Sequence, residues 1–219
     1  MQRPQARYDH IRRDNRRVAE ANATIRMSAP RHQGSVAVEQ AISRRRSVRG
    51  FGKSALSEDQ LSQLLWAAQG ITSRNSKRAV PLAGALYPLE VRVLCANVGA
   101  LSSGIYRYHP ASHDLQLVAA GRLLERLVAA ARHQEWIATA PAVIGISAVF
   151  ERTTVKYSNR GVGYVYMEAG PAAESLMLQA VAMGLETTMV GAFDDDEVKR
   201  LLHLAPHETP LCLIPVGIR

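Results

Sequence analysis

A run of arginines in the first quarter of the chain has the residue types and spacing to bind an anion: Arg44-Arg45-Arg46-Ser47-Val48-Arg49. Guanidinium groups are planar donors whose geometry matches phosphate and carboxylate oxygens. In extended backbone, alternate side chains point to the same side, so Arg45, Ser47 and Arg49 can together grip one phosphate. A basic run more often forms a solvated surface, and the pattern by itself leaves both interpretations open.

A second stretch combines a strand with a loop of small residues. Thr187 to Val190 is short and β-branched, which predicts a strand, and Gly191-Ala192-Phe193 then forms a tight turn. A strand that ends in such a loop leaves backbone N–H groups that can hydrogen-bond a flat polar ligand. The acids from Asp194 to Glu197 follow. We interpret them as the first turn of a helix, where the macrodipole favours them, rather than as a metal site.

The longest predicted element of the scaffold is the helix before this strand. Ala172 to Leu185 is rich in helix formers, almost uncharged, and apolar on more than one face, which indicates a buried helix. Gly184 is the predicted end of this helix. Pro171 lacks an N–H group and is expected to break or kink the helix near its start.

The other predicted elements mix helices with strands that need not alternate with them. Helices are expected over Val36–Arg46 with Val38, Ala41 and Ile42 inward, from the capping box Ser57–Gln60 to Gly70, and over Leu123–Ala131. Strands are expected over Glu90–Ala96, Gly104–His109, Leu115–Val118, Pro141–Phe150 and Leu211–Ile218. This mixture favours an α+β fold over a doubly wound parallel sheet.

The composition is that of a globular protein. The chain has 219 residues, of which 47% are hydrophobic, which is enough for one core. It has neither an apolar run long enough to span a membrane nor the apolar region of a secretory signal, so neither is expected. Cys95 and Cys212 lie in apolar runs, and we expect buried free thiols and a cytoplasmic location.

The positive charge is concentrated at the N-terminus. The formal net charge is +8, and residues 1–53 contain 13 Lys and Arg against 4 Asp and Glu. We expect residues 1–35 to be a basic extension and residues 36–219 to be the folded domain. Arg7–Arg26 of the extension could form a helix, but its apolar face would be narrow. A nucleic-acid arm is disfavoured, because aromatic interleaving and a recognisable binding module are missing. A solvated or partner-wrapping extension is the alternative.

Histidine and glycine patterns give no further site. The histidines at 109 and 113, and those at 203 and 207, are four apart, but a proline lies within each pair and no carboxylate completes a zinc site. Gly161-Val162-Gly163 lacks the third glycine of a dinucleotide fingerprint. We therefore expect no metal.

Arg45-x-Ser47-x-Arg49 with Phe51, followed by a Leu-rich helix that ends in Trp66–Gly70, resembles the opening of the FMN-dependent nitroreductase superfamily. Four later segments resemble its SagB-type dehydrogenase branch, which includes azoline oxidases: Ala83–Glu90, Glu151–Thr153 with Lys156-Tyr157, Met167–Gly170, and Val190–Asp195. Each segment is short, but their common order from about Ser28 to Arg219 makes them jointly specific.

The resemblance implies a mostly antiparallel sheet flanked by helices, in an intertwined homodimer whose FMN sites each draw on both chains. It implies that Arg45, Ser47 and Arg49 hold the FMN phosphate and ribityl chain, that Arg219 adds a phosphate contact, that Ala83, Gly84 and Ala85 line the flavin, and that the backbone of Gly191 and Ala192 faces the N5/O4 edge of the ring.

Lys156-Tyr157 resembles the Lys-Tyr pair that azoline oxidases use near the substrate. Ring oxidation requires loss of a hydride to flavin N5 and of a second proton, which a lysine with a lowered pKa or a tyrosine can accept. The alternative is a surface turn between a strand and the next helix, since Ser158–Gly161 follows.

Four places depart from the branch. Pro171 and Glu174-Ser175 replace its usual His and Gln-Asn, Gly163 replaces an Arg before Tyr164, and Leu82 replaces a Ser before Ala83. These changes spare the phosphate contacts but leave open a retuned or inactive substrate site.

Two functions therefore remain open. The first is an FMN-dependent oxidoreductase that passes hydride between flavin N5 and a small conjugated or heterocyclic substrate, either peptide-derived or in an NAD(P)H-dependent reduction. The second is a flavin-binding scaffold without turnover that acts through its basic N-terminal arm.

Overall fold

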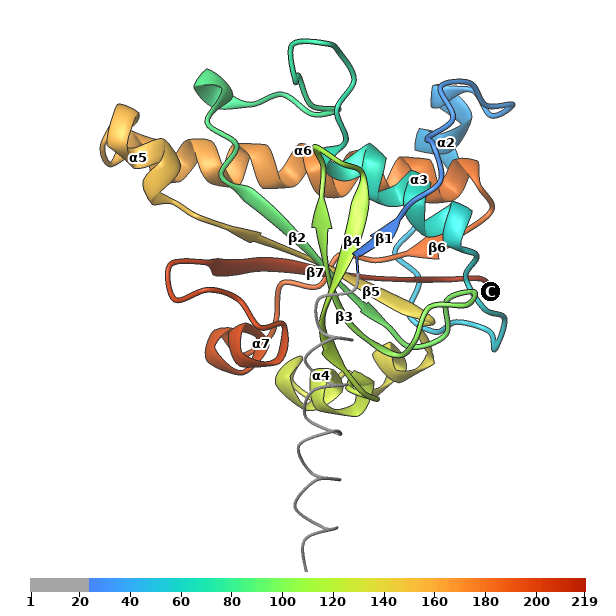
Figure 1. Cartoon of the computed structure of the whole chain (residues 1–219). Helices are drawn as coiled ribbons and strands as arrows, with labels where there is room; N and C mark the ends of the chain where they lie inside the picture. The colour runs from blue at the N-terminus through green and yellow to red at the C-terminus, as the bar shows by residue number, and fades with distance from the viewer. Residues whose placement is uncertain (1–23) are drawn as a thin grey trace, which may run out of the picture.

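A seven-stranded sheet runs through the middle of the molecule, as the computed structural model of residues 24–219 shows (Figure 1). Its strand order is β1-β4-β3-β2-β5-β7-β6, and every ladder in it is antiparallel. The strands are β1 (Thr24–Arg26), β2 (Leu89–Cys95), β3 (Gly104–His109), β4 (Asp114–Ala120), β5 (Ala142–Ala148), β6 (Glu186–Thr187) and β7 (Thr209–Gly217).

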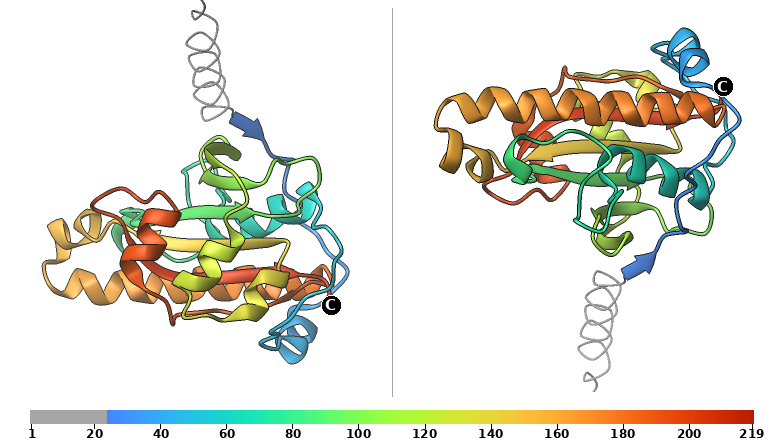
Figure 2. Two further views of the ribbon diagram at one scale, coloured as in Figure 1. Left: turned by 90° about the horizontal axis from the view of Figure 1, so that it is seen from below. Right: turned by 90° about the horizontal axis from the view of Figure 1, so that it is seen from above.

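Helices cover both faces of the sheet (Figures 1 and 2). They are α2 (Val38–Arg44), α3 (Glu58–Gln69), α4 (Leu124–Ala130), α5 (Glu151–Tyr157), α6 (Arg160–Ala182) and α7 (Asp195–Leu201), with short 3-10 turns η1 (Ala83–Ala85) and η2 (Glu135–Thr139). The helices α3 and α6 lie on one face, and α4 and α7 lie on the other. The predicted α+β class, with an antiparallel sheet flanked by helices, is confirmed.

The core has two layers because the central strands are buried on both sides. In β2, Val93 joins the cluster under α3 and α6, whereas the next residue, Leu94, joins the cluster with α4 and α7. Side chains alternate between the faces of a strand, so a strand in the middle layer must be apolar at nearly every position. All seven residues of β5 are accordingly buried.

Several local predictions are confirmed. The Ser57 side chain caps α3 and Gln60 returns the contact, so the capping box is complete. Gly184 follows α6 with φ 72°, the left-handed conformation that ends many helices. Asp194 caps α7 by accepting from the Glu197 backbone N–H. Cys95 and Cys212 are buried free thiols, and burial raises the pKa of each to about 12.

The predicted start of the long helix is wrong. Helix α6 begins at Arg160 and runs through Pro171 without a break. The residue before a proline is restricted by its own Cβ, and Gly170 has none. The carbonyl that loses its donor belongs to Met167, which is 60% exposed, so water can reach this part of the helix.

Other predictions also need correction. Ala41 of α2 is buried, but Val38 and Ile42 are each 58% exposed rather than inward. The strand expected over Thr187–Val190 is shorter, because β6 ends at Thr187 and Val190 forms only an isolated bridge.

The N-terminal prediction lies largely outside the described residues. Thr24–Arg26 pair with β4 as a strand, so they do not belong to the helix expected over Arg7–Arg26. The rest of that helix cannot be compared. Of the helices within residues 24–219, none combines the length and apolar character that a membrane crossing requires.

Candidate active site

The arginine run lies along the edge of the sheet. Ser47 forms a parallel bridge with Thr187 of β6, and the Val48 N–H donates to the Thr187 carbonyl over 3.0 Å. The segment after α2 is therefore held in extended form next to β6, which in turn pairs with β7 through Thr187 and Val216.

Arg219 lies at the same edge. The Gly52 N–H donates to the Ile218 carbonyl over 2.6 Å, which places the residue after Ile218 beside the end of the arginine run. Packing here is close, since a Cβ on Gly217 would lie 2.8 Å from Pro141 and 2.9 Å from Phe51. The structure thus brings Ser47 and Arg219 to one corner of the sheet.

This corner carries surplus positive charge. Arg45 approaches Glu174 of α6, with 3.8 Å between Nε and Oε1, and both side chains are partly exposed. Within residues 24–219, Arg49 and Arg219 form no ion pair. A partly exposed pair contributes little, so the Arg45 guanidinium remains available to another anion. The donor set fits a phosphate dianion.

The loop after Val190 lies within reach of this corner. Gly191 is four positions after Thr187, so it lies at most about 14 Å along the chain from the residue that pairs with Ser47. Gln134 donates to the Ala192 carbonyl and holds the loop. Among the described residues, the Gly191 and Ala192 N–H groups have no partner, and a Cβ on Gly191 would meet nothing within 4 Å. This open backbone fits the edge of a flat ring.

The remaining predicted residues form a second group. Ala83–Ala85 make the turn η1, and a Cβ on Gly84 would lie 2.7 Å from Tyr157 Oη and 3.1 Å from Lys156 Nζ. Lys156 and Tyr157 belong to α5, so the turn considered as an alternative for them is wrong. The Tyr157 ring also stands edge-on to Tyr164 of α6, with 5.1 Å between centroids.

The two groups lie toward opposite ends of α6. Helix α5 is at one end of α6, and β6 and the C-terminus are at the other (Figure 1). With 23 residues, α6 is about 34 Å long. One chain therefore does not bring Lys156 and Tyr157 to the corner that holds Ser47 and Arg219. The predicted site residues therefore form two separate groups in one chain.

Two charged residues beside η1 had no role in the sequence interpretation. Glu168 of α6 is 3% exposed and accepts from the Ala83 N–H over 2.6 Å. Burial raises the pKa of Glu168, while the hydrogen bond from Ala83 opposes that shift. Arg152 of α5 donates to the Tyr87 carbonyl over 2.7 Å. The sequence did contain one indication of a role for Glu168, because a buried acid on the apolar face of a long helix is costly without a partner.

Comparison with known proteins agrees with the fold. Residues 42–218 match the Nitroreductase family. A provisionally named nitroreductase of Methanocaldococcus jannaschii is 41% identical over 182 residues, which cover 83% of this chain and 91% of that protein. A crystal structure of a protein from Ralstonia eutropha, also provisionally named a nitroreductase, has a TM-score of 0.79 at 25% identity and covers 90% of each chain.

A second kind of relative is named for the processing of microcin B17. The microcin B17-processing protein McbC of Escherichia coli is 28% identical over 134 residues, and the match spans 58% of this chain and about half (49%) of McbC. The E. coli microcin synthetase McbBCD complex with truncated pro-MccB17 has a TM-score of 0.71 at 26% identity, over 86% of this chain and 75% of that one. The match to the family extends over most of the chain and includes every site residue named above except Arg219. The chain belongs to the nitroreductase family, a family of oxidoreductases.

Proposed function

We propose that this protein is an FMN-dependent oxidoreductase that acts as a homodimer. The observation that carries the proposal is the corner where Ser47 lies beside Thr187, with Arg45, Arg49 and Arg219 around it and the open Gly191 loop within about 14 Å along the chain. These arginines and Ser47 would hold the phosphate and ribityl chain, and the Gly191 and Ala192 backbone would face the ring. Bound FMN supplies a hydride acceptor and donor at N5.

The dimer would complete each site. Val162, Tyr166 and Met167 are exposed apolar residues on α6, and Gly163 and Gly170 leave its outer surface open. Contiguous exposed apolar surface marks interaction sites. A second copy on this face would bring its own Ala83–Ala85, Lys156 and Tyr157 to the corner of the first.

Lys156 and Tyr157 would work on the substrate side. Lys156 Nζ lies 5.2 Å from the centre of the Tyr157 ring, so the two side chains act in one small volume beside Gly84. The neutral amine or the phenolate can accept the proton that leaves the substrate when the ring is oxidised, and the ammonium or the phenol can return it in the reverse direction.

The substrate class in this proposal is a small conjugated or heterocyclic compound. The similarity to McbC supports a peptide-derived heterocycle, whereas the similarity to proteins named nitroreductase supports reduction with NAD(P)H. A cytoplasmic location, supported by the two free buried thiols, also belongs to the proposal. So does the division into a basic extension, residues 1–35, and a flavin domain, residues 36–219, with the strand Thr24–Arg26 of the extension joined to the sheet of the domain.

One contact favours a second candidate, a flavin-binding scaffold without turnover. Glu174 stands where the branch usually has an uncharged amide, and it partly neutralises Arg45. The partly exposed pair leaves Arg45 able to bind FMN, whereas the substrate side lacks the amide that the branch usually has at this position. In this candidate FMN binds, and the basic N-terminal arm contacts a partner.

Spectroscopy of the purified protein separates the candidates. An oxidoreductase would be yellow, would bleach with NADPH or NADH or with a thiazoline peptide in the absence of oxygen, and would regain colour in air. A scaffold would be yellow and unresponsive to all three. A colourless protein that binds no added FMN would contradict both.

A further inference from the structure

The loop from Ala83 to Tyr87 has an unfavourable backbone conformation. Gly84, Ala85 and Tyr87 have φ angles of 65°, 54° and 50°, all in the left-handed region. Glycine adopts this region freely, but alanine and tyrosine do so at a cost, because their Cβ atoms crowd the backbone. Such conformations persist only where surrounding groups hold them, and they concentrate at functional sites. The structure shows what holds this loop.

An acid holds the first residue of the loop. Glu168 Oε1 accepts from the Ala83 N–H over 2.6 Å, across 85 positions of sequence. Glu168 is 3% exposed, and its second oxygen, Oε2, is buried without a hydrogen-bond partner among the described residues. Removal of a carboxyl group from water costs free energy, and the single hydrogen bond from Ala83 offsets only part of this cost. An acid buried at such a cost indicates that its contact with the loop has a role.

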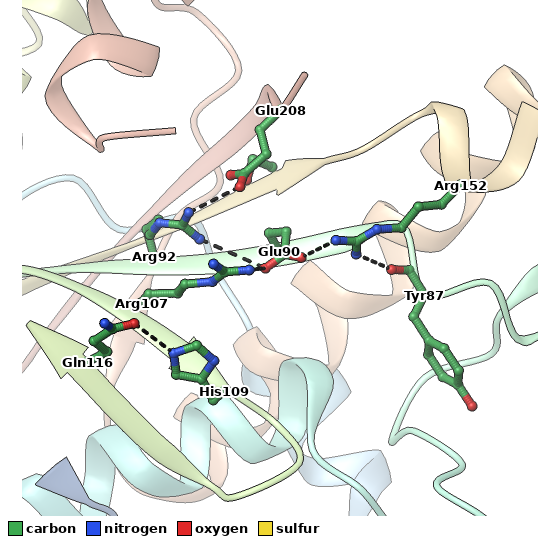
Figure 3. A network of polar contacts seen from close by, with 9 residues as sticks. Tyr87, Glu90, Arg92, Arg107, His109, Gln116, Arg152 and Glu208 are labelled. Atoms are coloured by element: carbon green, nitrogen blue, oxygen red, sulfur yellow. Dashed lines mark hydrogen bonds and ion pairs between the residues drawn. The ribbon is translucent and has the colours of Figure 1, made fainter. Parts of the chain in front are cut away.

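A base holds the last residue of the loop. Arg152 Nη1 donates to the Tyr87 carbonyl and Nη2 donates to Glu90 Oε1, each over 2.7 Å (Figure 3). Glu90 Oε2 accepts from Arg107, so the carboxylate that orients Arg152 is itself fixed. The Tyr87 ring lies 4.9 Å from the Arg78 guanidinium carbon. The planar fork of an arginine suits two acceptors at once.

The same two charged residues also fix the elements that carry the reactive pair. Arg152 and Lys156 are four residues apart on α5 and lie on one face of that helix. Glu168 and Tyr164 are four apart on α6, and Tyr164 packs against Tyr157. The contacts thus form a closed ring: loop, Arg152, α5, Tyr157, Tyr164, α6, Glu168 and loop again.

We propose that Arg152 and Glu168 are positioning residues that clamp the Ala83–Tyr87 loop from its two ends against Lys156 and Tyr157. The proposal rests on the proposed function, because it takes this loop as one wall of the flavin site. The clamp would set the distance between the wall and the proton-accepting pair. Neither residue needs to touch the substrate.

Hydrogen exchange of the Ala83 amide in the flavin-free protein, followed by NMR, reports on the clamp directly. Among the described residues, the acceptor of this amide is Glu168 Oε1. We expect Arg152→Gln and Glu168→Leu to speed its exchange by at least about tenfold, because opening of the loop then costs less. Glu168→Gln should stay within about twofold of the wild type, since an amide oxygen still accepts from Ala83.

Arg107→Gln is the matched control. It removes another arginine from Glu90 without a contact to the loop, and Arg92, whose Nη1 lies 4.0 Å from Glu90 Oε2, still holds that carboxylate. The Arg152 side chain is 39% exposed, so Arg152→Gln should fold. Its Ala83 exchange rate therefore tests the clamp even if Glu168→Leu does not fold. Arg152→Lys should resemble Arg152→Gln, since an ammonium group lacks the fork. Unchanged Ala83 exchange in Arg152→Gln, or an equal rise in Arg107→Gln, would overturn the clamp.

A second measurement tests the link to the flavin. In the variants with a freed loop, the visible circular dichroism of bound FMN should change, because the ring lies against a different surface, while Glu168→Gln and Arg107→Gln should retain the wild-type spectrum. An unaltered spectrum in Arg152→Gln with a freed loop would show that the loop is no wall of the site. A wild-type protein that binds no FMN would defeat the proposed function, and the exchange rates would still decide the clamp.

Discussion

Ser47 pairs with Thr187 across 140 positions of sequence, and the Val48 N–H reinforces the contact with the Thr187 carbonyl over 3.0 Å. Ser47 is exposed, so the pairing holds the backbone while the side chains on either side of it stay accessible. The arginine run is thus a fixed edge of the sheet and not a loose basic tail. A fixed edge can contact a phosphate without the loss of entropy that ordering a free tail would cost.

Replacement of the arginines tests the phosphate corner. Arg45→Ala with Arg49→Ala should weaken FMN binding by at least about a hundredfold, since two hydrogen bonds to a charged group contribute roughly 3 kcal/mol together. Fluorescence titration of FMN measures the affinity. Arg74→Ala with Arg126→Ala removes the same charge from exposed sites elsewhere and should leave the affinity nearly unchanged. Stoichiometric FMN in the first double variant would place the phosphate elsewhere.

The outer face of α6 tests the dimer. Tyr166→Glu with Met167→Glu places charges on two residues that are 56% and 60% exposed, so the isolated chain should still fold. Size-exclusion chromatography with light scattering should show a monomer, and FMN should be lost although every arginine remains. Ala129→Glu, on the exposed side of α4, is the control. A variant that remains a dimer with bound FMN would exclude this face.

Replacement of Gly84 tests the left-handed loop. Gly84→Ala should lower the free energy of unfolding by about 1 kcal/mol, because an alanine at φ 65° is strained. Its Cβ would also displace the Tyr157 hydroxyl, so reactions that use Tyr157 should slow. Thermal unfolding measures the first effect. Gly34→Ala is the control, because a Cβ at Gly34 would meet nothing within 4 Å and its φ lies outside the left-handed region. Equal melting temperatures for Gly84→Ala and the wild type would contradict the assigned conformation.

Glu168 predicts a dependence of stability on pH. Burial raises its folded-state pKa above the usual value near 4.5, so the folded protein binds more protons than the unfolded chain in that window. Stability contributed by this group is therefore present at low pH and is lost as pH rises from about 4.5 through the folded-state pKa. The melting temperature of Glu168→Gln, compared with the wild type across pH 4 to 8, should lack this component. Parallel curves for the two proteins would show that Glu168 does not titrate in this way.

Glu90 predicts the opposite sign. Burial by itself would raise its pKa, but the hydrogen bonds and charges of Arg152 and Arg107 outweigh burial and lower it. The stability from Glu90 is present above about pH 4.5 and is lost as pH falls through its folded-state pKa. Glu90→Gln should therefore flatten the acid limb of the melting curve. A Glu90→Gln protein as acid-sensitive as the wild type would assign that limb to other carboxylates.

The sequence alone determined what depends on a few neighbouring residues. The capping box of Ser57 and Gln60, the helix end at Gly184 and the acidic first turn of α7 could all be predicted from it, because each depends on interactions within about four residues. The strands of the central layer could also be predicted from the sequence, since a strand that is buried on both faces requires a nearly continuous apolar run.

Only the tertiary structure decided how distant segments meet. It placed Val38 and Ile42 outward, because α2 buries only Ala41, and it continued α6 through Pro171, where Gly170 avoids the clash and the freed carbonyl can reach water. The clamp joins Glu168 to Ala83 across 85 positions and Arg152 to Tyr87 across 65, which no local pattern encodes. The same holds for the two groups of predicted site residues toward opposite ends of α6. Their separation depends on how the chain returns along the sheet, which is a property of the whole fold.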